Sequence, residues 1–231
     1  MTQKNNGAEG NNDNGRILVI NPNSTQAVTN GIDEALNPFR FSNGPSFDCI
    51  TIETGPPGIA TQSHVDDAAA QVCDLIERED NAADAFVIAC FSDPGFYAAK
   101  EITTKPVFGI GMSSFAQATL LGERFGIIAI LEGSTVRQRR AVRIMGLDSR
   151  YAGSLPIGFG AEELAGDQVR DRMIEVGGTL IENNGADVLI MGCAGMAHFQ
   201  SDIETALGVP VIDPSQAAAS QALAATCLSR Q

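Results

Sequence analysis

Two apolar runs that each end in a cysteine recur in the two halves of the chain. ADAFVIACFSD (83–93) and ADVLIMGCAGM (186–196) both open with Ala-Asp, continue with mostly apolar residues and reach a thiol, Cys90 in the first and Cys193 in the second. This correspondence constrains the fold more than any other feature, because two segments that match in sequence are expected to occupy matching places in two similar units.

Further pairs of segments extend the correspondence. RILVINPNST (16–25) is matched by RFGIIAILEGST (124–135), and a Pro-Val dipeptide begins 16 residues after Cys90 and 17 residues after Cys193. Four corresponding signals in the same order indicate an internal repeat, and therefore two homologous halves.

Helical patterns separate the short apolar strands. TQAVTNGIDEAL (25–36), VDDAAAQVCDLIERE (65–79) and DQVRDRMIEVGGTLIENN (167–184) have the length and spacing of helices. Strands that alternate with helices predict an α/β fold of two pseudo-twofold-related lobes, each a parallel sheet flanked by helices. Because ligands bind beyond the carboxyl ends of parallel strands, we expect the active site in the cleft between the lobes.

The repeat also predicts the domain boundaries. Residues 16–118 should form the N-terminal α/β lobe and residues 119–231 the C-terminal one, whose last helix could pack back on the first lobe. Residues 1–15 are rich in Asn and Gly with little to bury, which predicts a disordered tail.

Charge excludes several kinds of partner. The formal net charge of -13 repels nucleic acid and anionic lipid surfaces, so we expect neither as a partner. The chain has no apolar run of the roughly 20 residues that span a bilayer, and its start lacks the apolar stretch of a secretory signal, which favours a cytoplasmic protein. Its five cysteines form no CxxC pair or zinc-ligand spacing, so we expect reduced thiols and no metal.

The position of two of the cysteines points to chemistry. Cys49, Cys73 and Cys227 lie within strand or helix patterns and are interpreted as small apolar residues. Cys90 and Cys193 instead follow matching strands, where backbone N–H groups and a helix N-terminus would lower the thiol pKa towards neutrality. Two such thiols on opposite sides of one carbon could remove a proton from one face and deliver one to the other, which is the reaction of a cofactor-independent racemase or epimerase.

Polar residues at other strand ends are candidate ligands of a small-molecule substrate. In NPNST, Asn23 and Ser24 are expected to cap the following helix, and these two residues with Asn21 could also orient a polar ligand. Asp93 is either a turn or cap residue or a substrate contact. Ser113 and Ser114, with Ser215 in the second half, are expected at strand ends as caps or substrate donors.

The remaining motifs are weak. GIGMSS (109–114) lacks the third glycine and the acidic residue of a dinucleotide fingerprint, so we expect no NAD. His64 and His198 are the only histidines and have no carboxylate at ligand spacing, so solvated or supporting roles are expected for them.

Together these motifs resemble the aspartate/glutamate/hydantoin racemase superfamily, and most of all its hydantoin and allantoin racemase branch. The matching pieces span nearly the whole chain after the tail: NPNST, GPPGIATQSHVDDAA, ACFSDPG, PVFGIG, RFGII and MGCAGM. The resemblance implies a site between two lobes, Cys90 and Cys193 as acid and base, no cofactor and a homo-oligomer. It also implies substrate contacts from Asn21, from the strand end near Ser113, and from the residues after each cysteine, which are Phe91, Ser92, Asp93, Ala194 and Gly195.

The chain departs from that branch at one place. Hydantoin racemases carry two threonines after the strand equivalent to RFGII, where this chain has Ala129-Ile130, so either Glu132 or Ser134 could supply the missing contacts. The segment 148–167 is also shorter than in that branch. Both changes lie near the expected substrate pocket and leave the thiols in place, so the chemistry is better supported than any one substrate.

Three functions therefore remain open. The leading one is racemisation of a carbon acid such as a 5-substituted hydantoin, allantoin or an amino acid derivative. The alternative is a lyase or cis-trans isomerase of the same superfamily, of the arylmalonate decarboxylase or maleate isomerase type. A binding protein built from two α/β lobes is the third, which two cysteines at matched positions disfavour because binding alone requires neither.

Overall fold

The computed structural model describes residues 14–228, so residues 1–13 of the predicted tail lie outside the described part of the chain. The elements of the first half are β1 (Arg16–Asn21), α1 (Gln26–Ala35), η1 (Asn37–Phe39), β2 (Ser46–Thr51), α2 (Gln62–Glu79), β3 (Ala85–Ile88), α3 (Phe96–Ile102), β4 (Val107–Gly109) and α4 (Ile110–Leu121).

The second half repeats this order of strands and helices. Its elements are β5 (Phe125–Ala129), α5 (Glu132–Ile144), η2 (Asp148–Arg150), β6 (Tyr151–Pro156), η3 (Ala161–Glu163), α6 (Asp167–Glu182), β7 (Val188–Met191), η4 (Ala194–Phe199), α7 (Gln200–Leu207), β8 (Val211–Ile212) and α8 (Pro214–Leu228).

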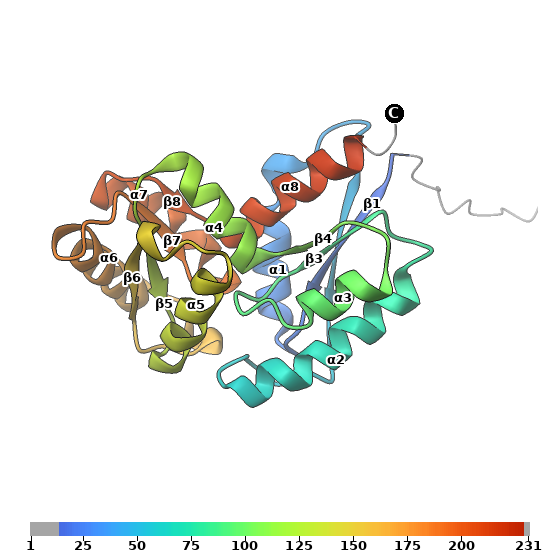
Figure 1. Cartoon of the computed structure of the whole chain (residues 1–231), viewed down its shortest axis with the longest axis horizontal. Coiled ribbons are helices and arrows are strands. Elements are labelled where there is room, and N and C mark those ends of the chain that lie inside the picture. Colours follow the sequence, from blue (N-terminus) through green and yellow to red (C-terminus); the bar gives the residue numbers. More distant parts are fainter. Residues whose placement is uncertain (1–13, 229–231) are drawn as a thin grey trace, which may run out of the picture.

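The two sheets have the same topology. Four parallel strands form each sheet, in the order β2-β1-β3-β4 in the first and β6-β5-β7-β8 in the second. Figure 1 shows the two sheets in separate lobes on the right and left of the molecule. The prediction of two related α/β lobes is confirmed.

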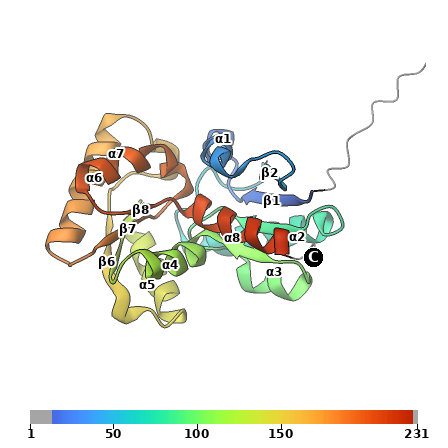
Figure 2. The same ribbon diagram turned by 90° about the horizontal axis from the view of Figure 1, so that it is seen from above.

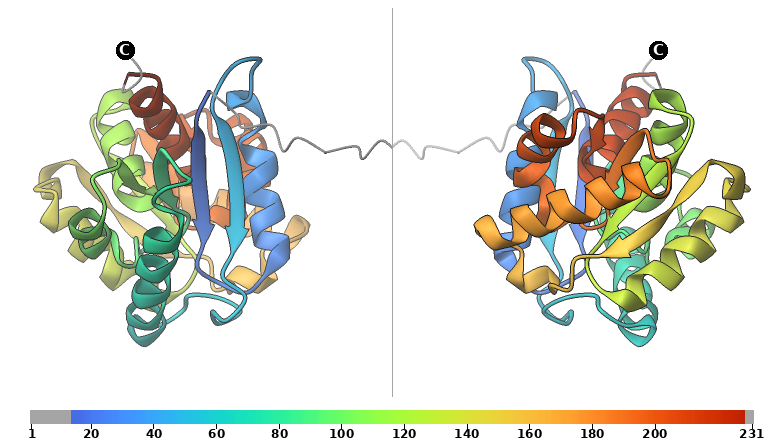
Figure 3. Two further views of the ribbon diagram at one scale, coloured as in Figure 1. Left: turned by 90° about the vertical axis from the view of Figure 1, so that its right-hand side faces the viewer. Right: turned by 90° about the vertical axis from the view of Figure 1, so that its left-hand side faces the viewer.

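The central strands are buried along their whole length because helices cover both faces of each sheet. Every residue of β3, β5 and β7 is buried, as continuous apolar sequence predicts for parallel strands. Along β1, Ile17 and Val19 pack with α1 and α8, whereas Leu18 and Ile20 pack with α2 and α3. Figure 3 shows α1 and α2 on opposite sides of the first sheet.

Two helices cross from one lobe to the other. Helix α8 follows the second sheet but contributes Ala218, Ala219 and Ala222 to the core of the first lobe. Helix α4 follows the first sheet but packs Phe115 and Ala118 in the core around β5 and β7. The two helices contact each other at the junction of the lobes (Figures 1 and 2). Each lobe is thus completed by a helix from the other half of the sequence. The predicted domain boundary near residue 118 stays a prediction.

The helix and strand patterns agree with the structure except after β4 and β8, because Ser215, also expected at a strand end, lies inside α8. Ser113 and Ser114 were expected at a strand end, but β4 stops at Gly109 and both serines lie inside α4. The expectation fails because the continuing apolar residues Ile110 to Met112 already belong to the first turn of a buried helix. Among residues 14–228, no helix is long and apolar enough to cross a membrane.

Candidate active site

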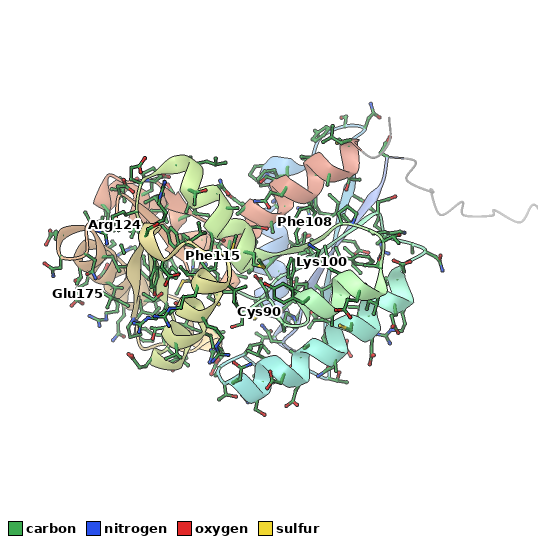
Figure 4. The ribbon with its side chains drawn as sticks, viewed as in Figure 1. Cys90, Lys100, Phe108, Phe115, Arg124 and Glu175 are labelled. Atoms are coloured by element: carbon green, nitrogen blue, oxygen red, sulfur yellow. The ribbon has the colours of Figure 1, made fainter. Side chains whose placement is uncertain are left out.

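The two predicted thiols meet in one hollow between the lobes. Cys90 follows the end of β3 by two residues, and Cys193 follows the end of β7 by the same number. Both line what we call the inner hollow, which holds about 470 Å³ of space, with solvent at its mouth included. Figure 4 shows Cys90 in the middle of the molecule, where the lobes face each other.

Several predicted substrate contacts lie in the same wall. Phe91 and Ser92 follow Cys90, Ala194 follows Cys193, and Asn23 reaches the hollow from the loop after β1. The wall therefore combines small and apolar surface with a neutral amide and a hydroxyl.

Other predicted contacts do not line this hollow in the described residues. Asn21 is 1% exposed and donates from Nδ2 to Asn23 Oδ1 at 3.1 Å and to Thr29 Oγ1 at 2.9 Å, so it supports Asn23 from behind. Ser24 and Gly195 lie outside the wall, as do the buried residues Ser113 and Ser114 of α4. The hydroxyl of Ser114 donates to the carbonyl of Ile110 in its own helix.

The predicted cap of the first helix is wrong in detail. Helix α1 begins at Gln26 and its N-cap is Thr25, whose side chain makes no capping bond. Asn23 Oδ1 instead accepts from the backbone N–H of Thr25 at 2.9 Å, ahead of the helix. The local Asn-to-backbone bond holds the loop and leaves Asn23 beside the thiols.

Asp93 lies in an adjoining space, the outer hollow, which Phe96, Tyr97 and Met112 also line. Its carboxylate accepts from the backbone N–H groups of Gly111 at 2.9 Å and Met112 at 2.8 Å, so it caps α4 from 18 positions earlier in the chain, whereas the turn or cap role predicted for it was a local one. Burial raises its pKa from 3.8 to about 7, against the lowering effect of those two hydrogen bonds.

The predicted lowering of the thiol pKa values is wrong for the free protein. Burial raises the pKa of Cys90 from 9.0 to about 12 and that of Cys193 from 9.0 to about 11. The backbone N–H groups that sequence reasoning invoked are present, since Ser92 and Gly195 each lie two residues beyond a thiol and lower its pKa. They do not outweigh the loss of water around the sulfur atoms.

The two thiols also affect each other. The charge of a Cys193 thiolate raises the pKa of Cys90, so the second proton is harder to remove than the first. When only one of the two cysteines is ionised, the pair offers one thiolate as a base and one thiol as an acid to a ligand bound between them.

The start of α5 supplies site residues that sequence reasoning missed or left open. Ser134, Arg137 and Gln138 line the inner hollow, whereas Glu132 does not, so of the two residues left open Ser134 is the one beside the thiols. These three residues stand at positions i, i+3 and i+4 and therefore share one helix face. Their spacing directly after a strand could have identified them as site residues from the sequence. Ile130 and Ala161 also line the hollow.

The histidines lie outside the inner hollow. His64 Nδ1 is 3.2 Å from the carbonyl oxygen of Gly58, and the ring of His198 lies against that of Phe199, tilted by 42° with centroids 3.8 Å apart. Burial lowers the pKa of His198. Within the described part of the chain, no cluster of three His, Cys, Asp or Glu side chains could hold a metal ion.

The pKa values predict the order in which the cysteines react. Since alkylation requires the thiolate, the exposed Cys227 should be carbamidomethylated before Cys90 and Cys193 in ligand-free protein at pH 7. Mass mapping after brief iodoacetamide treatment measures this, and labelling of the two inner thiols should increase as the pH is raised. Modification of Cys90 or Cys193 ahead of Cys227 at pH 7 would contradict the raised pKa values.

Comparison with known proteins places this geometry in context. The family model described as "Asp/Glu/Hydantoin racemase" matches residues 17–222. A hydantoin racemase of Pseudomonas sp. (strain NS671) is 35% identical over 203 residues, which cover 86% of this chain and 80% of that protein. The structure of an allantoin racemase from Klebsiella pneumoniae is 31% identical with a TM-score of 0.84, covering 93% of this chain and 89% of that chain. An allantoin racemase structure from Pseudomonas fluorescens is 25% identical with a TM-score of 0.88, covering 93% and 92%.

Proposed function

Since the chain belongs to the Asp/Glu/hydantoin racemase family and is an isomerase, we propose that it racemises a carbon acid next to a carbonyl, with Cys90 and Cys193 as base and acid. The observation that carries this proposal is the presence of both thiols in one hollow, each two residues beyond a matching strand of a different lobe. No cofactor takes part in the proposed reaction.

The proton balance needs only these two groups. One cysteine as thiolate takes the α-proton of the substrate, and the electron pair left behind is delocalised into the adjacent carbonyl. The other cysteine as thiol delivers its proton to the opposite face, which inverts the centre and leaves the two sulfur atoms with exchanged protonation states. For the other enantiomer the roles reverse.

The wall of the hollow favours a cyclic amide as substrate. Neutral hydrogen-bonding groups from Asn23, Ser92 and Gln138 lie around the thiols, and such groups suit the N–H and C=O groups of a ring such as a 5-substituted hydantoin or allantoin. The relatives named hydantoin racemase and allantoin racemase support this choice. An amino acid derivative is the other substrate class consistent with the mechanism.

The enzymatic rate should increase with pH. Because the pKa values of both thiols are raised, only a small fraction of the free protein carries a thiolate at pH 7. The value of kcat/KM is therefore expected to rise about tenfold per pH unit between pH 7 and pH 9, after subtraction of the uncatalysed rate. A profile that is flat over this range would contradict a thiolate base.

Polarimetry tests the proposal directly. Enantiopure 5-substituted hydantoins, allantoin and amino acids are incubated with the protein without added cofactor, and the rotation is followed to zero. We expect the optical rotation to decay while the total concentration of the compound, summed over both enantiomers, stays constant. Release of carbon dioxide from an arylmalonate, with no racemisation of any compound in the panel, would favour a lyase instead.

A further inference from the structure

Arg137 is a half-buried guanidinium without an acidic partner. Its nitrogen atoms approach only neutral oxygens: Ala60 O at 3.1 Å, Ser134 Oγ at 3.2 Å and Ser92 Oγ at 3.4 Å. Within residues 14–228 no carboxylate forms an ion pair with it, whereas Arg16 at the far end of the first sheet pairs with both Asp48 and Glu79. A charge removed from water without a counter-charge is costly, so its retention here requires an explanation.

The position of Arg137 supplies that explanation. It lines the inner hollow beside the thiols and also the outer hollow, so Arg137 belongs to the wall that the two hollows share. It is close enough to Cys90 for their charges to influence each other's pKa. Asp93, which lines the outer hollow as Arg137 does, is held by the N–H groups of Gly111 and Met112 and forms no ion pair with Arg137 within the described residues.

A second unpartnered group lies beside it. Gln138 is 4% exposed and lines the inner hollow, and its Oε1 has no hydrogen-bond partner among the residues that the structure describes. A Cβ atom added at Gly192 would lie 2.9 Å from Gln138 Nε2, so this amide sits directly against the loop that carries Cys193. A buried acceptor without a partner beside a cation without an anion indicates a ligand that brings both an N–H donor and a negative charge.

We propose that the substrate carries a carboxylate on the substituent of its reacting carbon, and that Arg137 binds this carboxylate. The proposal rests on the function proposed above, with an amide-containing ring between Cys90 and Cys193 and its N–H facing Gln138. The planar guanidinium offers the paired donors that a carboxylate accepts, and a ring without a charged substituent would leave it unpaired. The chain as a whole is strongly acidic, so the positive charge of Arg137 in the wall of the inner hollow, with Arg140 lining the outer hollow, is what favours an anion there.

Matched ligands test the proposal. Calorimetric titration compares 5-(2-carboxyethyl)hydantoin with its neutral carboxamide, on the wild-type protein and on Arg137→Gln, Arg137→Lys and Arg139→Gln variants. Arg139 is the control, because it is an exposed arginine of the same helix that lines neither hollow. The acid should bind about 10- to 100-fold more tightly than the amide to wild type and to Arg139→Gln. Arg137→Gln should lose this preference, and Arg137→Lys should keep part of it.

Other outcomes would overturn the inference. Equal binding of acid and amide to the wild type would do so, as would an Arg137→Gln variant that weakens both ligands equally, since the arginine would then act only on Cys90 or on the fold. Racemisation rates of the same two compounds separate this failure from that of the proposed function. If neutral hydantoins are racemised and the acid has no advantage, the proposed function stands and the role of Arg137 is refuted. If the acid binds through Arg137 but no compound is racemised, the carboxylate site stands and the proposed function is refuted.

Discussion

Replacing either inner cysteine by serine should abolish racemisation but leave one half of the reaction measurable. A serine hydroxyl has a pKa far above that of a thiol, so the rate of racemisation is expected to fall by at least about a thousandfold in Cys90→Ser and in Cys193→Ser. The thiolate that remains still faces one side of the bound carbon, because both sulfur atoms line the same hollow.

Exchange with deuterated water makes this remaining half visible. Each variant should exchange the α-hydrogen of one enantiomer for deuterium with retention of configuration, and the two variants should select opposite enantiomers. Proton NMR of each enantiopure substrate measures the exchange, and Cys227→Ser, which replaces an exposed cysteine, is the control that should behave as wild type. Near wild-type racemisation in both single variants, or exchange of the same enantiomer by both, would exclude the paired-thiol mechanism.

Truncation of Phe115 should cause a large loss of stability. Phe115 is fully buried in α4, meets the ring of Phe91 edge-on with centroids 5.6 Å apart, and stacks on Phe125 at 5.7 Å. It thereby ties the loop after Cys90 to the core of the second lobe (Figure 4). Phe115→Ala is expected to lower the free energy of unfolding by about 3–5 kcal/mol, as large cavities in aromatic cores do.

Denaturation with urea at constant pH measures this loss. Leu120→Ala on the same helix is the matched control, because Leu120 is 84% exposed and its truncation should change the free energy of unfolding by less than about 0.5 kcal/mol. Similar small effects of both substitutions would mean that α4 does not hold the two lobes together as the packing indicates.

The fold could be predicted from the sequence because the repeat and the strand pattern are local signals. Segments such as AFVI and VLIM are apolar throughout and therefore belong inside a sheet covered on both faces. The exchange of α4 and α8 between lobes could not be predicted in the same way. Both helices consist largely of apolar and small residues without a clear polar face, so their sequences do not indicate which sheet they cover.

The sequence predicted the site residues whose place depends on local chain position, and it missed those that are brought to the site by packing between distant segments. Cys90 and Cys193 were found because each follows one of two matching parallel strands, and ligands bind beyond the carboxyl ends of such strands. The partners of Asp93 lie 18 and 19 residues further along the chain, and Arg137 approaches Ala60 across 77 positions, so neither contact leaves a local signal. The thiol pKa values were misjudged because burial, which raises them, depends on how the two lobes pack around the sulfur atoms and not on the neighbouring N–H groups.

The fate of solvent deuterium in the wild-type reaction tests the central claim most directly. An enantiopure 5-substituted hydantoin is incubated with the protein in deuterated water, and deuterium at the reacting carbon is measured separately in the product enantiomer and in the remaining substrate during the first turnovers. Two thiols on opposite faces predict deuterium in the product while the remaining substrate keeps its original hydrogen. Deuterium appearing equally in both enantiomers from the start would contradict this account, because one group would then be serving both faces.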